Sequence, residues 1–330
     1  MAIQVPALEA RDLSVTVNLR DGGQATVVDH IDFEIGAGGS LGLVGESGSG
    51  KTMTSLAIMR LLPRSVNVES GQVLLAGEDL LKLDEGHMRR RRGSRIAMIL
   101  QDPMTALDPS FTIRSQLAEP MRQHRHLSGK ALEEAMVSAL EQVHLPAPKR
   151  ILDAYPHQLS GGMRQRVTSA IALAGNPSVL IADEPTTALD VTTQARYLQL
   201  LEELQQTHGF ALLLVTHDLL IVKQVCTRLV VMYGGRVAEI GTVDEIFEAP
   251  QHPYTRALLG AIPVIGDDVH LESIEGQAPD LRDQSPGCNF APRCKFARDV
   301  CRTSNPALTT RGEDHAARCW GTEPGGWITE

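Results

Sequence analysis

The chain lacks any long apolar run. Its longest hydrophobic stretches, such as Phe210–Val215, have the length of one strand, whereas a membrane-spanning helix needs about 20 apolar residues. The start of the sequence also lacks a basic segment followed by an apolar one, so we expect no secretory signal. These two absences predict a cytosolic protein, whose role at a membrane would come only through partner subunits.

Basic residues are in the minority. Lys and Arg number 31 against 40 Asp and Glu, which gives a formal net charge of -9 and a pI near 5.7. Nucleic acid binding requires a basic face for the phosphates, so this balance argues against nucleic acid as the main partner. The one basic run, Arg89–Arg92, follows Asp84 and Glu85 and is expected to be a solvated helix end.

Cysteine is scarce except near the C-terminus. Cys226 stands alone, and the other four are Cys288, Cys294, Cys301 and Cys319. In a reducing compartment such a cluster indicates metal binding before disulfides. Four thiolates suit a [4Fe–4S] cluster or Zn²⁺, but zinc sites usually have closer cysteine pairs than these. We expect an iron–sulfur cluster with a structural role, and zinc is the alternative.

The stretch Leu41–Thr52 carries the clearest chemical signal, LGLVGESGSGKT. A short apolar run predicts a buried strand, Thr54–Leu62 has a helical pattern, and the turn between them fits G-x-x-x-x-G-K-[ST]. Glycines let successive N–H groups point at phosphates, and the helix adds its positive end. Lys51 can reach the β- and γ-phosphates, and the Thr52 hydroxyl can bind Mg²⁺. The candidate residues are Gly45, Glu46, Ser47, Gly48, Ser49, Gly50, Lys51 and Thr52.

Two further apolar strands end in polar residues. Val179–Ala182 is followed by Asp183 and Glu184, and Ala211–Val215 leads to His217. At the carboxyl end of a parallel strand, Asp183 can hold Mg²⁺ and Glu184 can polarise a water molecule. His217 is a functional candidate for the same positional reason.

The remaining elements place these motifs along the chain. From about Asp102 to Gly175 the sequence lacks strand patterns, and Ser160-Gly161-Gly162 opens a helix whose N-terminus is available to an anion. The other expected strands are Leu8–Val17, Ala25–Ile35, Gly71–Leu75, Arg95–Leu100, Arg228–Tyr233 and Arg236–Ile240. The first two and the last two are expected to form hairpins.

The motifs occur in the order seen in ABC transporter ATPases, which the chain resembles. They are the phosphate loop, Gln101, LSGGM (Leu159–Met163), VLIADEPT (Val179–Thr186), Ala188-Leu189-Asp190 and His217. Further stretches resemble the ATPase subunits of oligopeptide and dipeptide importers, whose close relatives import nickel. These are GESGSGKT, QDPMTALDP, YPHQLSGGMRQRV, HPYTRALLGAIP (His252–Pro263) and the tail with GQAPDL and SPGCNFAPRCKFARDVC.

The resemblance implies a fold and a division into domains. The fold class is α/β, with a phosphate-loop (RecA-like) ABC ATPase core, an antiparallel β subdomain and an inserted helical subdomain of about residues 102–175. The nucleotide-binding domain is expected over residues 1–241. A small irregular extension with the four-cysteine cluster is expected over residues 242–330.

The resemblance also implies residue roles in ATP hydrolysis. Gly45–Thr52 would cradle the phosphates, and Thr52, Gln101 and Asp183 would serve the Mg²⁺ ion. Glu184 would be the general base or water-polarising carboxylate, and His217 would sense the γ-phosphate.

Other roles require a second ATPase subunit, either a copy or a paralogue. Ser160, Gly161 and Gly162 would contact the γ-phosphate of ATP held by that subunit, and Asp190 would belong to the loop that communicates across the dimer. Many ABC ATPases stack adenine on an aromatic residue, but Asp21–Asp29 contains none. We therefore expect nucleotide affinity to rest more on phosphate contacts.

The function implied is that of an ATPase that drives a peptide importer from the cytoplasmic face of the inner membrane. Its partners would be the second ATPase subunit, two transmembrane permease subunits and an extracytoplasmic peptide-binding protein, with no nucleic acid. One alternative is an importer of nickel or another small solute, because the sequence leaves the cargo open.

Two classes of protein outside transport are less favoured. A soluble ABC-type ATPase of chromosomes, DNA breaks or ribosomes usually carries a long coiled-coil insertion or a second ATPase domain, and this chain has neither. A phosphate-loop kinase or GTPase would not need LSGGM and His217, and no NKxD-type motif is present.

Overall fold

The structure is a computed structural model that describes residues 5–19, 22–187, 189–262, 274–280, 286–312 and 314–328. The chain divides into two compact units. Unit 1 comprises residues 1–8, 34–40 and 74–215, and unit 2 comprises residues 9–33, 41–73 and 216–330. Ala188, Pro263 and residues 264–273 and 281–285 lie outside the described residues.

Unit 1 is built on three parallel strands. They are β6 (Ile96–Ile99), β7 (Val179–Asp183) and β8 (Ala211–Val215), in the order β6-β7-β8. Every residue of β7 and β8 is buried, which is why their sequences are continuously apolar instead of alternating. Because the strands are parallel, their carboxyl ends meet at one edge of the sheet.

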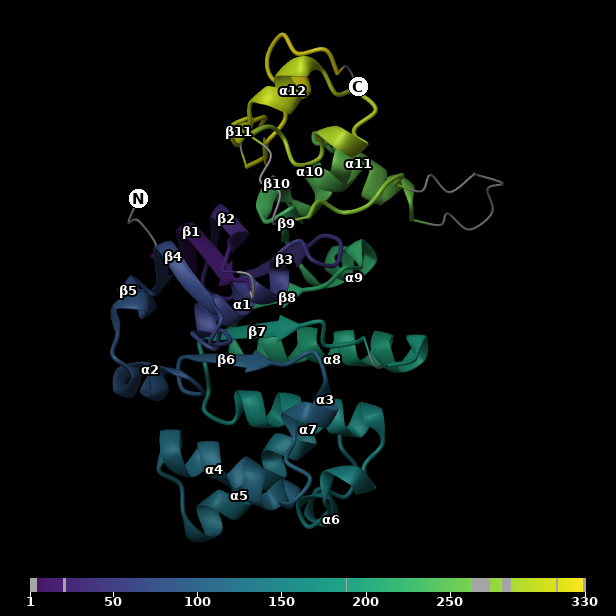
Figure 1. The fold of residues 1–330 in the computed structure, drawn as a ribbon. Coiled ribbons are helices and arrows are strands. Elements are labelled where there is room, and N and C mark those ends of the chain that lie inside the picture. The colour runs from purple at the N-terminus through teal and green to yellow at the C-terminus, as the bar shows by residue number, and fades with distance from the viewer. Residues whose placement is uncertain are drawn as a thin grey trace. The chain divides into compact units, whose positions relative to one another are not determined.

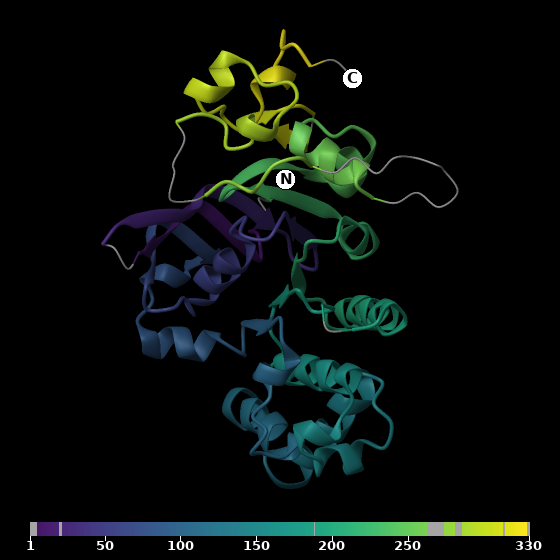
Figure 2. The same ribbon diagram turned by 45° about the vertical axis from the view of Figure 1, so that its right-hand side comes forward.

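The expected helical segment is a group of helices in unit 1 (Figures 1 and 2). Its members are α3 (Pro103–Ala106), α4 (Ile113–Arg125), α5 (Gly129–Gln142), α6 (Pro148–Leu152), η2 (Pro156–Gln158) and α7 (Gly161–Leu173). Buried Leu117, Met121 and Leu140 lie on the inner faces of α4 and α5, and α7 also contacts β6. The helix α8 (Val191–His208) connects β7 to β8.

The basic run lies at the end of an exposed helix, as expected. Helix α2 (Glu85–Arg91) follows β5 (Glu78–Asp79) and η1 (Leu80–Lys82). Arg91 donates to both carboxylate oxygens of Glu78 at 2.7 Å, and Arg92 donates to Glu85 at 2.6 Å. The run therefore pairs with neighbouring acids.

Unit 2 contains strands of two sheets. In one, the strands β1 (Leu8–Asn18), β2 (Gln24–Ile35) and β4 (Val66–Leu75) lie in the order β2-β1-β4. In the other, β3 (Ser40–Val44) is parallel to β9 (Arg228–Tyr233). Strand β9 pairs in turn with β10 (Arg236–Thr242) in the hairpin that the sequence predicts.

The helices of unit 2 include α1 (Lys51–Met59), which begins three residues before the expected Thr54. It can do so because Gly50, with φ of 101°, completes the turn of the preceding loop, and it ends at Arg60, which has a φ of 51°. The others are α9 (Leu219–Val225), α10 (Val243–Glu248), α11 (Pro253–Gly260), α12 (Asp299–Thr303), η3 (Ala291–Arg293) and η4 (Trp320–Thr322).

The C-terminal extension adds two very short strands to the second sheet. Strand β12 (Ala316–Ala317) pairs with β10, Glu239 lying opposite Ala317, and β11 (Thr309–Thr310) pairs with β12. A two-residue strand has no hydrophobic period, which is why the sequence gives no sign of it.

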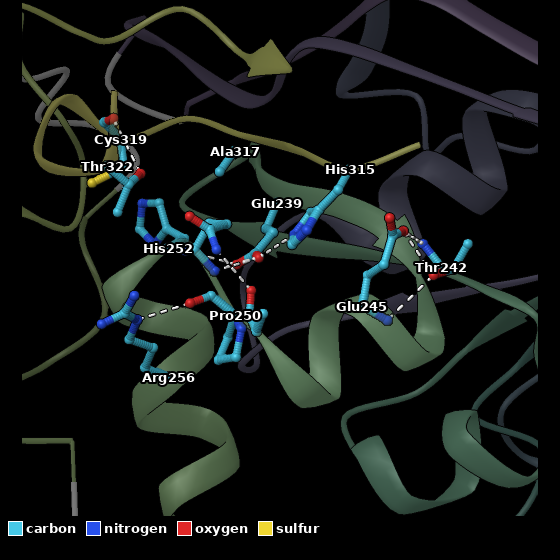
Figure 3. Close-up of polar contacts among 12 residues, drawn as sticks. Glu239, Thr242, Glu245, Pro250, His252, Arg256, His315, Ala317, Cys319 and Thr322 are labelled. Carbon is cyan, nitrogen blue, oxygen red and sulfur yellow. Dashed lines mark hydrogen bonds and ion pairs between the residues drawn. The ribbon is translucent and has the colours of Figure 1, made fainter. Parts of the chain in front are cut away.

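Glu239 of β10 is the polar centre of this junction (Figure 3). The side chain is fully buried, and its carboxylate accepts hydrogen bonds from the backbone N–H of Gln251 at 2.6 Å and of His252 at 2.8 Å. The Nε2 atom of His315 lies 2.7 Å from the same carboxylate. One carboxylate thereby joins β10, the start of α11 and the segment before β12.

We predict that Glu239→Gln lowers the free energy of unfolding by about 1–3 kcal/mol, because the amide NH₂ replaces one of two oxygens that each accept from a backbone N–H. Urea unfolding of the full chain measures the change. Glu248→Gln, the same replacement at an exposed position of α10, is the control, with an expected change below about 0.5 kcal/mol. Equal stability of the two variants would contradict this role of Glu239.

Candidate functional site

The segment Gly45–Gly50 forms a loop between β3 and α1, with the strand before it and the helix after it that the motif requires. Gly45 has a φ of 154°, and a Cβ atom there would lie 2.2 Å from the carbonyl oxygen of Met232. A Cβ atom at Gly50 would lie 2.5 Å from the carbonyl oxygen of Val27. Backbone from β9 and β2 therefore approaches the loop so closely that only glycine fits at these two positions.

Lys51 folds back over this loop. Its side chain is buried, and Nζ donates to the carbonyl oxygens of Gly45 at 2.8 Å and Glu46 at 2.9 Å. The N–H of Ser49 donates to the carbonyl oxygen of Glu46 at 3.2 Å. A cation and a set of backbone N–H groups at a helix N-terminus form a site for an anion.

The loop is also held by α11. The backbone N–H of Glu46 donates to the hydroxyl of Tyr254 at 2.9 Å. Tyr254 is fully buried, and burial raises the pKa of its hydroxyl, which keeps it neutral. The sequence motif marks Glu46 but gives no sign of this partner, which is 208 residues further along the chain.

In unit 1, the carboxyl ends of β6 and β7 bring Gln101 to Glu184. Nε2 of Gln101 donates to Oε2 of Glu184 at 3.0 Å, and the hydroxyl of Thr187 donates to the same oxygen at 2.9 Å. Asp183 is buried at the end of β7. Glu184 has a φ of 44°, and its N–H donates to the carbonyl oxygen of Val215 at 2.8 Å. The two donors fix the direction of the Glu184 carboxylate.

The same unit brings the LSGGM segment to Asp190. Ser160 caps α7, and its hydroxyl accepts from the N–H of Met163 at 3.3 Å. Asp190 caps α8 and accepts from the N–H of Thr193 at 3.0 Å and from its hydroxyl at 2.7 Å. These bonds from Thr193 hold the pKa of Asp190 below its ordinary value. A Cβ atom at Gly162 would lie 2.8 Å from Cγ2 of Thr193, so Thr193 touches both segments.

His217 lies in unit 2, in the turn between β8 and α9, and is exposed. The N–H of Asp218 donates to the Thr216 hydroxyl at 3.1 Å, and the Asp218 side chain caps α9. The turn thereby presents His217 at its surface.

Sequence reasoning missed Thr187 and Thr193. Each stands three residues after the carboxylate that it contacts, Glu184 or Asp190. For Thr193 this is the ordinary spacing of an N-cap and its partner, so the pattern could have been found.

The four C-terminal cysteines line one small pocket in unit 2. Its other walls include Phe290, Trp320 and Trp327. All the cysteines are free thiols, and burial, with a smaller contribution from neighbouring cysteines, raises the pKa of Cys294 to about 11. As the side chains stand, no group of three or more His, Cys, Asp or Glu residues in the described ranges could hold a metal ion. The thiols converge, but no ligand set is preformed.

Comparison with protein families gives two matches. The ABC transporter family matches residues 28–187. The family described as oligopeptide/dipeptide transporter, C-terminal region, matches residues 238–301.

Individual proteins agree with these matches. A peptide import ATP-binding protein of Brucella ovis is 45% identical over 327 residues, covering 95% of this chain and 96% of its own. The dipeptide transport ATP-binding protein DppD of Bacillus subtilis is 46% identical over 301 residues, with 91% of this chain and 90% of its own covered. The solved ATP-binding cassette MJ0796, bound to ADP and Pi, is similar with a TM-score of 0.64 and 26% identity. That match covers 72% of this chain and 98% of the cassette.

The fold and the matches define an ATPase of the ABC class. The chain belongs to the ABC transporter family, in the group of peptide import ATP-binding proteins. Among the described residues, no helix has both the length and the hydrophobicity to cross a membrane.

We predict that Gly162→Ala destabilises the chain by about 1–3 kcal/mol, because its methyl group would lie 2.8 Å from Cγ2 of Thr193 and overlap it. Thr193→Ser removes Cγ2, keeps the hydroxyl for Asp190, and should restore most of the stability in the double variant. Gly161→Ala, where a Cβ atom meets nothing within 4 Å, is the matched control. Thermal unfolding measures all three, and a double variant no more stable than Gly162→Ala would contradict the contact.

Proposed function

We propose that this chain hydrolyses ATP to power a peptide importer, and that its residues play the roles assigned below. The observation that carries the catalytic assignment is the carboxylate of Glu184, which follows the buried Asp183 and is held by Gln101 and Thr187. The high identity to peptide import ATP-binding proteins over nearly the whole chain supports the transport role.

The loop Gly45–Thr52 binds the phosphates of ATP. The N–H groups and Lys51 would bind the β- and γ-phosphates, and Thr52, Gln101 and Asp183 would serve Mg²⁺. Their hydroxyl, amide and carboxylate oxygens are of the ligand types that Mg²⁺ prefers. The ion would neutralise charge that develops on the phosphates.

Glu184 acts as the general base or water-polarising group. A carboxylate whose direction is fixed by Gln101 and Thr187 can orient a water molecule for attack. Thr187 is a positioning residue in this scheme, since its hydroxyl helps to fix the direction in which the carboxylate points. His217 senses the γ-phosphate from the exposed turn before α9.

Hydrolysis requires a second ATPase subunit. Ser160, Gly161 and Gly162 form the N-terminus of α7, which presents N–H groups to the γ-phosphate of ATP bound by that subunit. Asp190 communicates across the dimer, and its contact with Thr193 links it to the same segment. The dimeric form of MJ0796 supports this assignment by analogy.

The remaining partners are membrane permease subunits, two in number, and an extracytoplasmic peptide-binding protein. The ATPase would sit at the cytoplasmic face of the inner membrane. The cargo is a dipeptide or oligopeptide, and a nickel chelate is the alternative that the same family of subunits allows. The domain division at residue 241 is part of this proposal.

The four-cysteine pocket would hold a metal centre, either a [4Fe–4S] cluster or Zn²⁺, after a rearrangement of its side chains, which as they stand form no ligand set. Cys288, Cys294, Cys301 and Cys319 would be the ligands, and their shared pocket supports the assignment. Burial raises the pKa of Cys288 and of Cys294, so metal binding must displace protons from these thiols and assembly is favoured at higher pH. The centre would cross-link an extension whose elements are too short to form a core of their own.

We predict that Glu184→Gln keeps ATP binding and lowers turnover at least about 100-fold, the range expected for loss of a general base. The assay is phosphate release by the complete membrane complex, with ATP binding measured in parallel. Glu141→Gln, at an exposed position of α5, should hydrolyse ATP at the parent rate. Turnover near the parent level in the Glu184→Gln complex would overturn the assignment.

We predict that protein purified without oxygen contains iron and sulfide and absorbs broadly in the visible. Cys301→Ser should lose the absorption, whereas Cys226→Ser, at the cysteine outside the cluster, should retain it. Metal analysis decides between the two centres: stoichiometric zinc in colourless protein supports the zinc site. Neither metal in the purified full chain would contradict a metal centre.

A further inference from the structure

Arg293 lies in the C-terminal extension, immediately before Cys294, and all five of its N–H donors are used. Its Nε atom donates to the carbonyl oxygen of Glu275 at 2.9 Å, and Nη2 donates to that of Ile274 at 3.2 Å. Nη1 donates to the hydroxyl of Tyr233 at 3.1 Å. Only 7% of the side chain is exposed. The guanidinium is therefore fixed in position and orientation.

The two remaining donors bind Glu46 of the phosphate loop. Nη1 lies 2.8 Å from Oε2 and Nη2 lies 3.2 Å from Oε1, which is the bidentate arrangement of a strong ion pair. Glu46 is 27% exposed, and its backbone carbonyl accepts from Lys51. The ion pair thus connects Arg293 of the extension to Glu46, whose backbone carbonyl oxygen accepts a hydrogen bond from Lys51.

An aromatic cluster supports the pair. The rings of Tyr233 and Tyr254 lie 4.5 Å apart, and Phe290 of the extension lies 5.1 Å from Tyr233 and 5.4 Å from Tyr254. Tyr254 accepts from the N–H of Glu46, and Tyr233 accepts from Arg293. The backbone of Glu46 is therefore bound by Tyr254, and its carboxylate is bound by Arg293, which in turn contacts Tyr233. Both tyrosines belong to the same aromatic cluster.

We propose that Arg293 is a positioning residue for nucleotide binding, through which the C-terminal extension shapes the phosphate loop and neutralises the negative charge of Glu46. The inference rests on the assignment of Gly45–Thr52 as the phosphate-binding loop. Without Arg293, the Glu46 carboxylate would stand uncompensated in a loop that receives a polyanion, and the residue that carries the Lys51 contact would lose its anchor.

This role predicts the direction in which each substitution changes the affinity for ATP. Arg293→Gln should weaken binding of ATP with Mg²⁺ about tenfold or more, because a net negative charge is left beside the phosphates. Arg293→Gln combined with Glu46→Gln removes that charge and should recover most of the lost affinity. An extension that only stabilises the fold would give a double variant at least as impaired as the single one.

The experiment is isothermal titration calorimetry of the full chain with ATP and Mg²⁺, with thermal unfolding of each variant alongside. Arg298→Gln is the matched control. Arg298 belongs to the same extension, where its guanidinium carbon lies 4.2 Å from the centre of the Trp327 ring. This substitution changes the net charge by the same amount as Arg293→Gln and should leave the affinity for ATP unchanged. If Arg293→Gln does not fold, Arg293→Lys keeps the charge without the bidentate fork and should show an intermediate loss.

Parent-level affinity in both Arg293 variants, or no recovery in the double variant, would overturn this inference. Lys51→Ala separates its failure from that of the loop assignment. If Lys51→Ala abolishes binding while the Arg293 variants bind normally, only the positioning role is wrong. If Lys51→Ala binds ATP normally, the loop assignment itself is wrong.

Discussion

The close approach of neighbouring backbone to the phosphate loop is the constraint around which the rest of unit 2 is arranged. A Cβ atom at Gly45 or Gly50 would overlap backbone oxygens of β9 or β2, so the loop is held in shape by strands far from it in sequence. The N–H of Gly235, in the hairpin after β9, adds a bond of 3.2 Å to the carbonyl oxygen of Ser49. An anion site made of backbone groups gains from such rigidity, because little order has to be created when the ligand binds.

The C-terminal extension is part of this arrangement. β12 joins the sheet beside β10, the buried Glu239 fixes the start of α11, and α11 carries Tyr254 to the loop. Asn289 donates to the carbonyl oxygen of Gly234 at 2.8 Å, next to the hairpin residue that contacts the loop. The match of residues 238–301 to the oligopeptide/dipeptide transporter C-terminal region therefore concerns a segment in contact with the nucleotide-binding motif of the same unit.

The sequence predicted elements with a strong local pattern: the strand, loop and helix of the phosphate site, the apolar strands β7 and β8, and the helical segment that precedes them. It could not predict the contacts that join them. Arg293 and Glu46 are 247 residues apart, and charged residues of either sign occur throughout the chain. The burial of Glu239 has no local sign either, because its carboxylate is enclosed by partners 12 to 76 residues further along the chain.

Whether this ABC ATPase drives peptide import can be measured on the reconstituted complex. The tagged chain should be purified from solubilised membranes and its associated subunits identified, and ATP-dependent uptake of a labelled dipeptide should be measured in vesicles that contain the complex. We expect integral membrane subunits to co-purify and uptake to require ATP inside the same compartment as this chain. Recovery of the chain without membrane subunits, or ATP-dependent uptake of nickel but of no peptide, would contradict a role in peptide import.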